Sequence, residues 1–287
     1  MISELHAHVF MDGIDYKKSV ARFQDGVDKT AVRSALCEYQ KRGISFVRDG
    51  GDHFGACLYA KSIAHEYGIT YRMPVYALYK EGNYGRVAGV PYRSFHEYHE
   101  KVSEAKKLGA DFIKIMVSGI LDFDRFGAVS ETNYSFGEVK ELVHIAHEEG
   151  FAVMAHASGT EKVRFAAEAG VDSIEHGYYM DADTMDVLAD NKIVWVPTAV
   201  TSANLLGTGR FDEHEVAKIA DAHKAAIAEA ACRGVLIGCG SDAGAFSVLH
   251  GQGALDEHAM LSDLLGSNAE SVMQAAFDII VSKFQTE

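Results

Sequence analysis

The sequence predicts an α/β protein that folds as a (β/α)8 TIM barrel, with one domain over residues 1–287. Short apolar segments rich in β-branched residues alternate with longer amphipathic segments, a pattern typical of a parallel sheet with helical connections. Eight such units are present, and eight is the number that closes a barrel. The length of the chain is also typical of one barrel. Neither a linker nor an internal repeat divides the chain.

Eight strands are expected from the apolar segments. In chain order they cover residues 2–8, 44–50, 69–78, 111–117, 151–157, 173–177, 193–198 and 235–244. Glycines that could end a helix stand just before several of these strands, at Gly43, Gly109, Gly150, Gly170 and Gly234. A doubly wound open sheet fits less well, because no Gly-rich phosphate-binding turn follows the first strand. The final stretch, NAESVMQAAFDIIVSKFQTE, is expected to form a closing helix.

The composition excludes several classes of protein. Apolar residues (48%) and charged residues (24%) are in the range of globular proteins, which excludes a disordered chain. A formal net charge of −14 without a basic block argues against a nucleic-acid or anionic-membrane partner. The N-terminus lacks the features of a signal peptide, and no segment approaches about 18 apolar residues. We therefore expect a cytoplasmic protein that acts on a small molecule and keeps its cysteines reduced, namely Cys37, Cys57, Cys232 and Cys239.

Residues able to bind a metal fall at or near the ends of five predicted strands. The active site of such a barrel lies at the carboxyl ends of its strands. The residues are His6 and His8 in the first strand, Lys114 in the fourth, His156 in the fifth, His176 in the sixth and Asp242 in the eighth. A single strand-end histidine is more often a buried polar residue than a ligand. Several independent coincidences would be needed to place all of these residues at strand ends, so the joint pattern predicts a metal centre.

Lys114 is the least expected member of this set. It lies in the apolar segment FIKIM, and burying an ammonium group is costly unless the group is paired or chemically changed. An ion pair with Asp242 inside the barrel would satisfy it, and Asp242 alone could also cap the following helix. The helical histidines His144 and His147 are expected to face solvent. His53 and His250 fall in loops at the active face.

These residues together resemble the metal-ligand set of the amidohydrolase superfamily of metal-dependent hydrolases. Other segments are similar to its motifs: GISFVRDGG to G-x-T-x-V-R-D-x-G, FIKIMVSG to I-K-I-M-x-x-G, HASGTEKVRFAAEAGVDSIEHGYYMD to the run that ends in D-S-I-E-H-G, and GSDAGAFSVLHGQGALDEHAML to G-T-D-x-G…H-G-x-x-x-x-E-L-x-x-M. They cover most of residues 5–262. The similarity is greatest to the prolidase-like and imidazolonepropionase-like branch, which includes dipeptidases and carboxypeptidases.

The resemblance implies a site for two divalent ions. The more buried ion would be bound by His6, His8 and Asp242, and the second ion by His156 and His176. Lys114, carbamylated by CO2, would bridge the two ions, because carbamylation converts a buried cation into an anionic oxygen ligand. Imidazole and carboxylate ligands suit Zn2+, with Mn2+, Fe2+ or Co2+ as substitutes.

The activity implied by the resemblance is hydrolysis of an amide or related C–N bond in a peptide-like or cyclic substrate. One ion would polarise the carbonyl oxygen, and a hydroxide bridging the two ions would attack the carbon. Asp242 would accept the proton of the hydroxide and deliver it to the leaving nitrogen. Lys114 and His176 complete the expected catalytic set.

Substrate contacts are expected from loop residues at the same end of the barrel. His250 and Tyr178 are candidates for orienting the substrate, although Tyr178 could also simply pack beneath the rim. A substrate with a free carboxylate would need a cationic anchor in this acidic protein. Arg125 and Arg210 follow the fourth and seventh strands and could supply it, unless they are only surface residues.

Three alternatives stay open at this point. A mononuclear deaminase or imidazolonepropionase-type aminohydrolase is disfavoured, because such deaminases usually carry a glutamate two or three residues after the strand-five histidine and generally lack the strand-four lysine. Here the first glutamate after His156 is Glu161. Lactone or phosphotriester hydrolysis uses nearly the same ligands. A degenerate barrel that retains metal without turnover is disfavoured by the intact ligand set.

The sequence departs from the family pattern at its ends. Family members usually begin with, and return to, a small β-sandwich, whereas H-x-H here begins at residue 6. We therefore expect a barrel that lacks the accessory β-sandwich, or whose start lies further upstream. Apolar barrel surface left uncovered in this way could be buried in a homo-oligomer.

Overall fold

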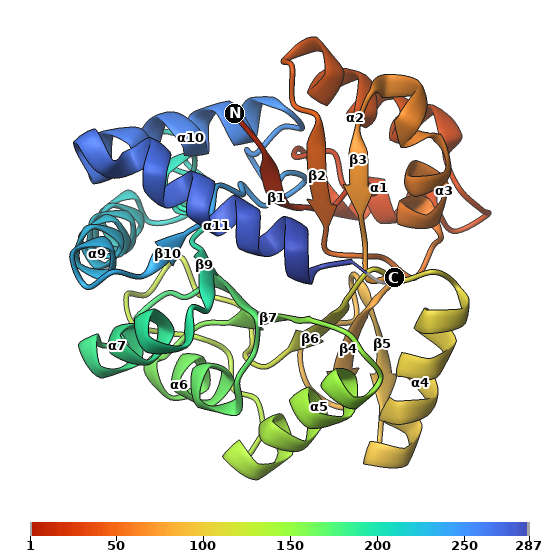
Figure 1. The fold of residues 1–287 in the computed structure, drawn as a ribbon. Helices are drawn as coiled ribbons and strands as arrows, with labels where there is room; N and C mark the ends of the chain where they lie inside the picture. The colour runs from red at the N-terminus through yellow and green to blue at the C-terminus, as the bar shows by residue number, and fades with distance from the viewer. Residues whose placement is uncertain (1, 286–287) are drawn as a thin grey trace.

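A computed structural model describes residues 2–285 and confirms the predicted α/β architecture (Figure 1). Its strands are β1 (Glu4–Ala7), β2 (Phe46–Asp49), β3 (Thr70–Arg72), β4 (Ala77–Lys80), β5 (Gly89–Tyr92), β6 (Ile113–Met116), β7 (Val153–Ala157), β8 (Ser173–His176), β9 (Val194–Val196) and β10 (Leu236–Ile237). Its α-helices are α1 (Tyr16–Arg22), α2 (Lys29–Lys41), α3 (Ala56–Ile63), α4 (Phe95–Lys107), α5 (Phe136–Glu148), α6 (Thr160–Ala169), α7 (Ala182–Asn191), α8 (Val200–Ala203), α9 (Glu213–Cys232), α10 (Gln252–Leu265) and α11 (Ala269–Lys283). Two 3-10 turns, η1 (Ala64–Tyr67) and η2 (Gly266–Asn268), complete the elements.

The strands pair in parallel, in the orders β1-β2-β3 and β10-β9-β8-β7-β6-β4-β5. Backbone hydrogen bonds join the two groups on both sides. On one side Leu5 N donates to Cys239 O (3.0 Å) and Asp242 N donates to His6 O (2.7 Å). On the other, Asp111 N donates to Met73 O (2.9 Å). The strands thus surround a common interior, with helices around the outside (Figure 1).

The third predicted strand, 69–78, is corrected by the structure. It divides into β3 and β4, because Pro74 lacks an N–H group for a ladder and Val75 adopts a left-handed backbone conformation (φ +71°). Sequence reasoning also missed β5, whose sequence GVPY contains two residues that are poor in strands. Within residues 2–285, strand β5 pairs only with β4 and forms an edge, where a proline is tolerated.

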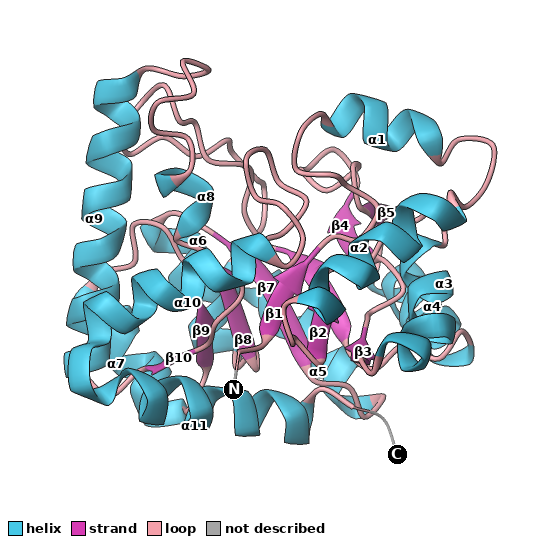
Figure 2. Ribbon diagram, turned by 90° about the horizontal axis from the view of Figure 1, so that it is seen from above, coloured by secondary structure: helices cyan, strands magenta, loops and turns pink. Residues whose placement is uncertain are grey.

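The two ends of the barrel differ in character. Long loops gather at one end, and α11 crosses the other (Figure 2). Helix α11, the expected closing helix, buries Ala276 and Ile280, together with the adjacent Phe284, against the apolar interior beside Leu5 and Phe112. Because apolar side chains fill this end, a polar functional site is expected at the opposite, loop-covered end.

Two further features of the described chain concern its cysteines and the length of its apolar helices. All four cysteines are free thiols. Between residues 2 and 285, no helix combines the length and apolarity needed to cross a bilayer.

Candidate metal centre

The six predicted metal ligands lie together at the loop-covered end of the barrel. We call them the strand-end cluster; they are His6, His8, Lys114, His156, His176 and Asp242. The imidazole centroids of His6 and His176 are 5.0 Å apart, and those of His156 and His176 are 4.6 Å apart. Ligand atoms of His6, His8 and Asp242 all lie within 4.8 Å of one another, so this group could hold a metal ion.

The ammonium position of Lys114 is surrounded by imidazoles. Its Nζ is 3.2 Å from His6 Nε2 and 3.3 Å from His8 Nε2, and the residue is 1% exposed. Among residues 2–285, no carboxylate oxygen lies within the 4.0 Å that would make an ion pair with it. Burial lowers the pKa of Lys114, which favours the uncharged amine. The structure therefore does not contain the Lys114–Asp242 ion pair considered from the sequence.

Hydrogen bonds orient three of the imidazole rings. His6 Nδ1–H donates to Glu175 Oε2 (2.7 Å), which leaves Nε2 to face Lys114. His176 Nδ1 contacts the Thr198 hydroxyl (2.8 Å), which leaves Nε2 available. His156 uses the other nitrogen: its Nε2–H donates to a backbone carbonyl (3.0 Å), so Nδ1 is its available nitrogen.

All four histidines of the strand-end cluster are held as neutral rings. Burial lowers the pKa of His156 to about 4 and the pKa values of His6, His8 and His176 well below their ordinary range. The neutral imidazole is the form that binds a metal.

Asp242 reaches the cluster from a left-handed backbone conformation. It lies in the loop after β10 with φ +60°, and His176, at the end of β8, has φ +69°. Such left-handed conformations are unfavourable for most residues and are often found where function requires them. The Asp242 carboxylate lies 3.6 Å from His6 Nε2 and 3.7 Å from His8 Nε2. Burial raises its pKa to about 7.

Sequence reasoning missed the charged residues that lie behind the cluster. Arg48 of β2 and Glu175 of β8 are both fully buried and form an ion pair (2.8 Å). Glu175 in turn contacts His6. Both residues stand within predicted strands, in the segments SFVRDG and SIEHG. That placement was the available signal, because charged residues are rarely fully buried without a partner.

Gly50, directly after β2, is required by the same close packing. A Cβ atom at this position would lie 2.4 Å from His8 Cε1 and 2.5 Å from Lys114 Nζ. Gly50→Ala is therefore expected to destabilise the fold by about 1–3 kcal/mol and to displace the cluster, because an added methyl group overfills the site. Denaturant unfolding and metal content would measure both effects.

Gly137→Ala is the matched control for this prediction. Gly137 lies in α5, and nothing lies within 4 Å of its added Cβ. We expect unchanged or slightly higher stability, since alanine restricts the unfolded chain more than glycine does. Equal stability and metal content in the two variants would contradict the packing argument.

A cavity of about 480 Å³ opens onto the strand-end cluster. Five of the six cluster residues line it, and His6 does not. Its remaining walls are largely apolar and aromatic, and include Met11, Tyr16, Tyr84, Ile120, Phe123, Phe211 and Phe246. We call this space the main cavity. An apolar cavity with a few convergent polar groups is the usual form of a small-molecule site.

Two of the four predicted substrate contacts line the main cavity. Tyr178 is 3% exposed, stacks on His223 (3.8 Å between centroids) and shares a hydrogen bond with Thr201 Oγ1 (2.9 Å). Arg210 also lines the cavity, with its guanidinium 4.0 Å from the ring centroid of Phe246. Within the described chain, no carboxylate forms an ion pair with Arg210.

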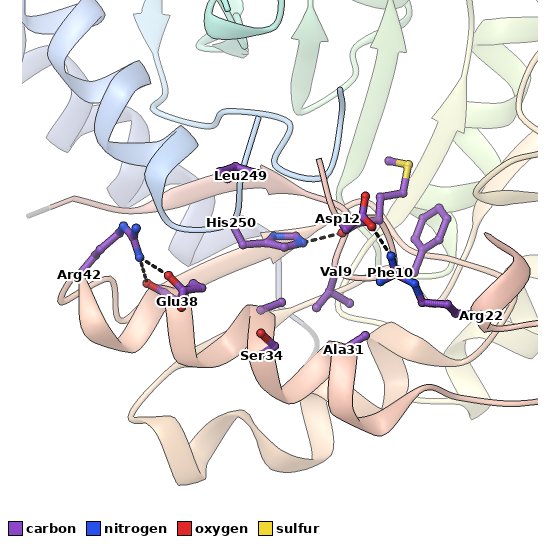
Figure 3. A pocket seen from close by; sticks show the side chains of 12 residues that line it. Val9, Phe10, Asp12, Arg22, Ala31, Ser34, Glu38, Arg42, Leu249 and His250 are labelled. Carbon is purple, nitrogen blue, oxygen red and sulfur yellow. Dashed lines mark hydrogen bonds and ion pairs between the residues drawn. The ribbon is translucent and has the colours of Figure 1, made fainter. Parts of the chain in front are cut away.

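The structure places the other two outside this cavity. The Arg125 side chain is 76% exposed beside Asp122. His250 borders a separate cavity of about 260 Å³ (Figure 3). There its Nε2–H donates to Met11 O (2.7 Å), and its Nδ1 contacts the Tyr39 hydroxyl (3.0 Å). Both ring nitrogens of His250 are thus used to join the loop after β1 to α2.

The fold and this cluster define a class of protein: a parallel barrel in which side chains able to bind a metal converge at one end. The model of the amidohydrolase family matches residues 2–277. The chain belongs to the amidohydrolase family.

Individual relatives cover the chain to different extents. The ochratoxinase of Aspergillus niger is 30% identical over 152 residues, which are 50% of this chain and 32% of that protein. An uncharacterized protein of Mycobacterium tuberculosis is 29% identical over 182 residues, 61% of this chain and 47% of that protein. The matches thus span less than half the length of these curated relatives.

Solved structures show the same fold. A Xaa-Pro dipeptidase with bound methionine superposes with a TM-score of 0.75 at 21% identity, over 96% of this chain and 72% of that one. The A. niger ochratoxinase structure gives a TM-score of 0.76 at 22% identity, over 98% and 71%.

Proposed function

We propose that this chain is a binuclear metal-dependent hydrolase that cleaves an amide or related C–N bond in a small molecule. The observation that carries the proposal is the strand-end cluster, in which neutral imidazoles, a carboxylate and a buried lysine converge beside the main cavity. Membership of the amidohydrolase family supports the same activity.

The residues fit two divalent ions, with Zn2+ best suited to imidazole and carboxylate ligands. His6, His8 and Asp242 would hold one ion, and His156 and His176 the other. Lys114, carbamylated by CO2, would bridge them. Three features support this assignment: Lys114 lies within 3.3 Å of two imidazole nitrogens, it lacks an ion pair in the described structure, and Gly50 leaves the space free of a side chain.

When bound, divalent ions would supply Lewis acidity for a carbonyl oxygen and would lower the pKa of water. Asp242 then takes a proton from the attacking water and delivers it to the leaving nitrogen. Lys114 and His176 would act by holding the ions. The apolar walls of the main cavity would contact the apolar parts of a substrate.

Arg210 is proposed as the anchor for a carboxylate on the substrate. Its guanidinium stacks on Phe246, lines the main cavity and has no ion-pair partner among residues 2–285. Arg210→Met is expected to lower kcat/KM about 10- to 100-fold for substrates with a carboxylate, because a hydrogen bond to a charged group contributes about 1.5–3 kcal/mol. For amidated forms of the same substrates, Arg210→Met should lower kcat/KM only slightly.

Arg125→Met is the matched control for the anchor, because Arg125 is exposed, as Arg210 is, but lies outside the main cavity. We expect it to leave kcat/KM unchanged. Steady-state kinetics on acid and amide pairs of one substrate measures the difference. Equal losses on acid and amide in Arg210→Met would contradict a carboxylate-binding role.

The deciding experiment for the function is a screen of metal-loaded protein against dipeptides, N-acyl amino acids, cyclic ureides and lactones. Turnover of amides that is lost on chelation and regained with Zn2+ is the expected result. Elemental analysis should find about two divalent ions per chain. Full activity with one ion would contradict the binuclear site, and turnover of lactones alone would contradict amide hydrolysis.

A further inference from the structure

A buried ion pair lies directly behind one member of the strand-end cluster. Arg48 NH2 donates to Glu175 Oε1 (2.8 Å), and both side chains have no exposed surface. Arg48 is held in place by two more hydrogen bonds, from Nε to Leu5 O (2.7 Å) and from NH1 to Ser173 Oγ (2.9 Å). The Ser173 hydroxyl donates to Glu175 Oε1 as well (2.6 Å). Strands β1, β2 and β8 are thereby tied together beneath the cluster.

This arrangement gives the two oxygens of Glu175 different tasks. Oε1 accepts hydrogen bonds from Arg48 and Ser173, whereas Oε2 faces His6 Nδ1 at 2.7 Å. A carboxylate oxygen at Oε2 accepts, so the ring proton of His6 stays on Nδ1. The lone pair of His6 is then on Nε2, the nitrogen that faces Lys114 and Asp242.

We propose that Glu175, oriented by Arg48 and Ser173, is a positioning residue that fixes the tautomer of His6. It thereby strengthens the binding of the ion held by His6, His8 and Asp242 relative to the second ion. This inference rests on the proposed metal site.

The other rings of the cluster have weaker restraints. The partner of His176 Nδ1 is the hydroxyl of Thr198, which can donate or accept and so suits either tautomer. His156 donates to a neutral backbone carbonyl. His8 Nδ1 is buried without a charged partner in the described structure, and the ring interacts with the neutral backbone of Gly51. The charged restraint on His6 therefore acts on one of the two proposed ions.

Glu175→Gln tests the proposal with almost no change of shape. Arg48 and Ser173 both donate toward the Oε1 position, so the amide oxygen of glutamine must occupy it. The amide NH2 group then points at His6 Nδ1 and donates to it. The His6 proton moves to Nε2, where it blocks a metal.

We expect Glu175→Gln to bind one of the two ions about 10- to 100-fold more weakly, as for other partners of metal-ligating histidines. Chelator competition with Zn2+ would measure the two affinities separately. Long-range 1H–15N spectra of the histidine rings should show His6 with its proton on Nε2 in the metal-free variant and on Nδ1 in the parent protein.

Glu257→Gln is the matched control. Glu257 is also fully buried, but it accepts hydrogen bonds from the backbone N–H groups of Ala199 and Val200 and contacts no member of the cluster. Glu257→Gln should leave the affinities for both metal ions and the tautomer of His6 unchanged. If Glu175→Gln does not fold, Ser173→Ala, which keeps both charges, should weaken the same ion by a smaller factor.

The outcomes separate this inference from the proposed function. A parent protein that binds no divalent ion contradicts the function itself. A parent protein that binds two ions, with a folded Glu175→Gln variant that keeps both affinities and the Nδ1 proton, overturns the role of Glu175 alone. Equal weakening of both ions, with a lower melting temperature of the metal-free variant, would also overturn it in favour of a general structural role.

Discussion

Asp242→Asn is expected to retain the fold and to lose about three or more decades of kcat, since general acid–base catalysis alone contributes about 10²–10⁴-fold. Asparagine has the shape of aspartate and is among the few residues that tolerate the left-handed backbone (φ +60°) found here. It cannot accept and return a proton as a carboxylate does. Steady-state kinetics at saturating Zn2+, with thermal unfolding as the check on the fold, measures the effect.

Metal content decides how such a loss is interpreted. An amide oxygen can still contact His6 and His8 from the same position, so the variant should retain measurable metal. Near-normal turnover with metal bound would contradict the role of Asp242 in proton transfer. His176, which lines the same cavity, would then be the next candidate.

Lys114→Ala is expected to abolish turnover and to weaken metal binding more than about 100-fold. Mutating a residue that only hydrogen-bonds to a metal ligand already lowers metal affinity about 10- to 100-fold. Only an uncharged amine reacts with CO2, and burial lowers the pKa of Lys114 toward that form. A short carboxylic acid in solution should partly restore activity by filling the bridge. Activity and metal content, with and without the acid, are the measurements.

The exposed Lys107 provides the control for this prediction. Lys107→Ala should keep full activity and show no response to the acid. In the parent protein, reloading with Zn2+ after chelation should be slow without bicarbonate and faster with it. A metal-loaded, active crystal with a bare ammonium at Lys114 would contradict the carbamate.

These two predictions concern members of the strand-end cluster, which converge at one end of the barrel. The substrate contacts depend instead on loops. His250 illustrates the difference: the sequence places it after the eighth strand, at the correct end of the barrel, yet its ring is used to join Met11 to Tyr39. Loop position along the chain does not specify the direction of a side chain.

Much of the architecture follows from local patterns. Alternating apolar and amphipathic segments predict the order of strands and helices, and α11 follows from its own periodicity. The strand-end cluster was also predictable, because parallel strands bring their carboxyl ends to one face and so bring His6, His156 and His176 together without knowledge of any loop. The division of 69–78 into β3 and β4 was missed, although Pro74 was visible.

Other features required the folded structure. Arg48 and Glu175 are 127 positions apart in the chain, and only the barrel brings them into contact with each other and brings Glu175 into contact with His6. The same is true of the contact between Arg210 and Phe246 and of the space that Gly50 leaves beside Lys114. Periodicity reports which face of an element is buried, whereas partners, tautomers and close approaches depend on distances between segments that are remote in sequence. Those distances exist only once the sheet is formed and its interior is packed.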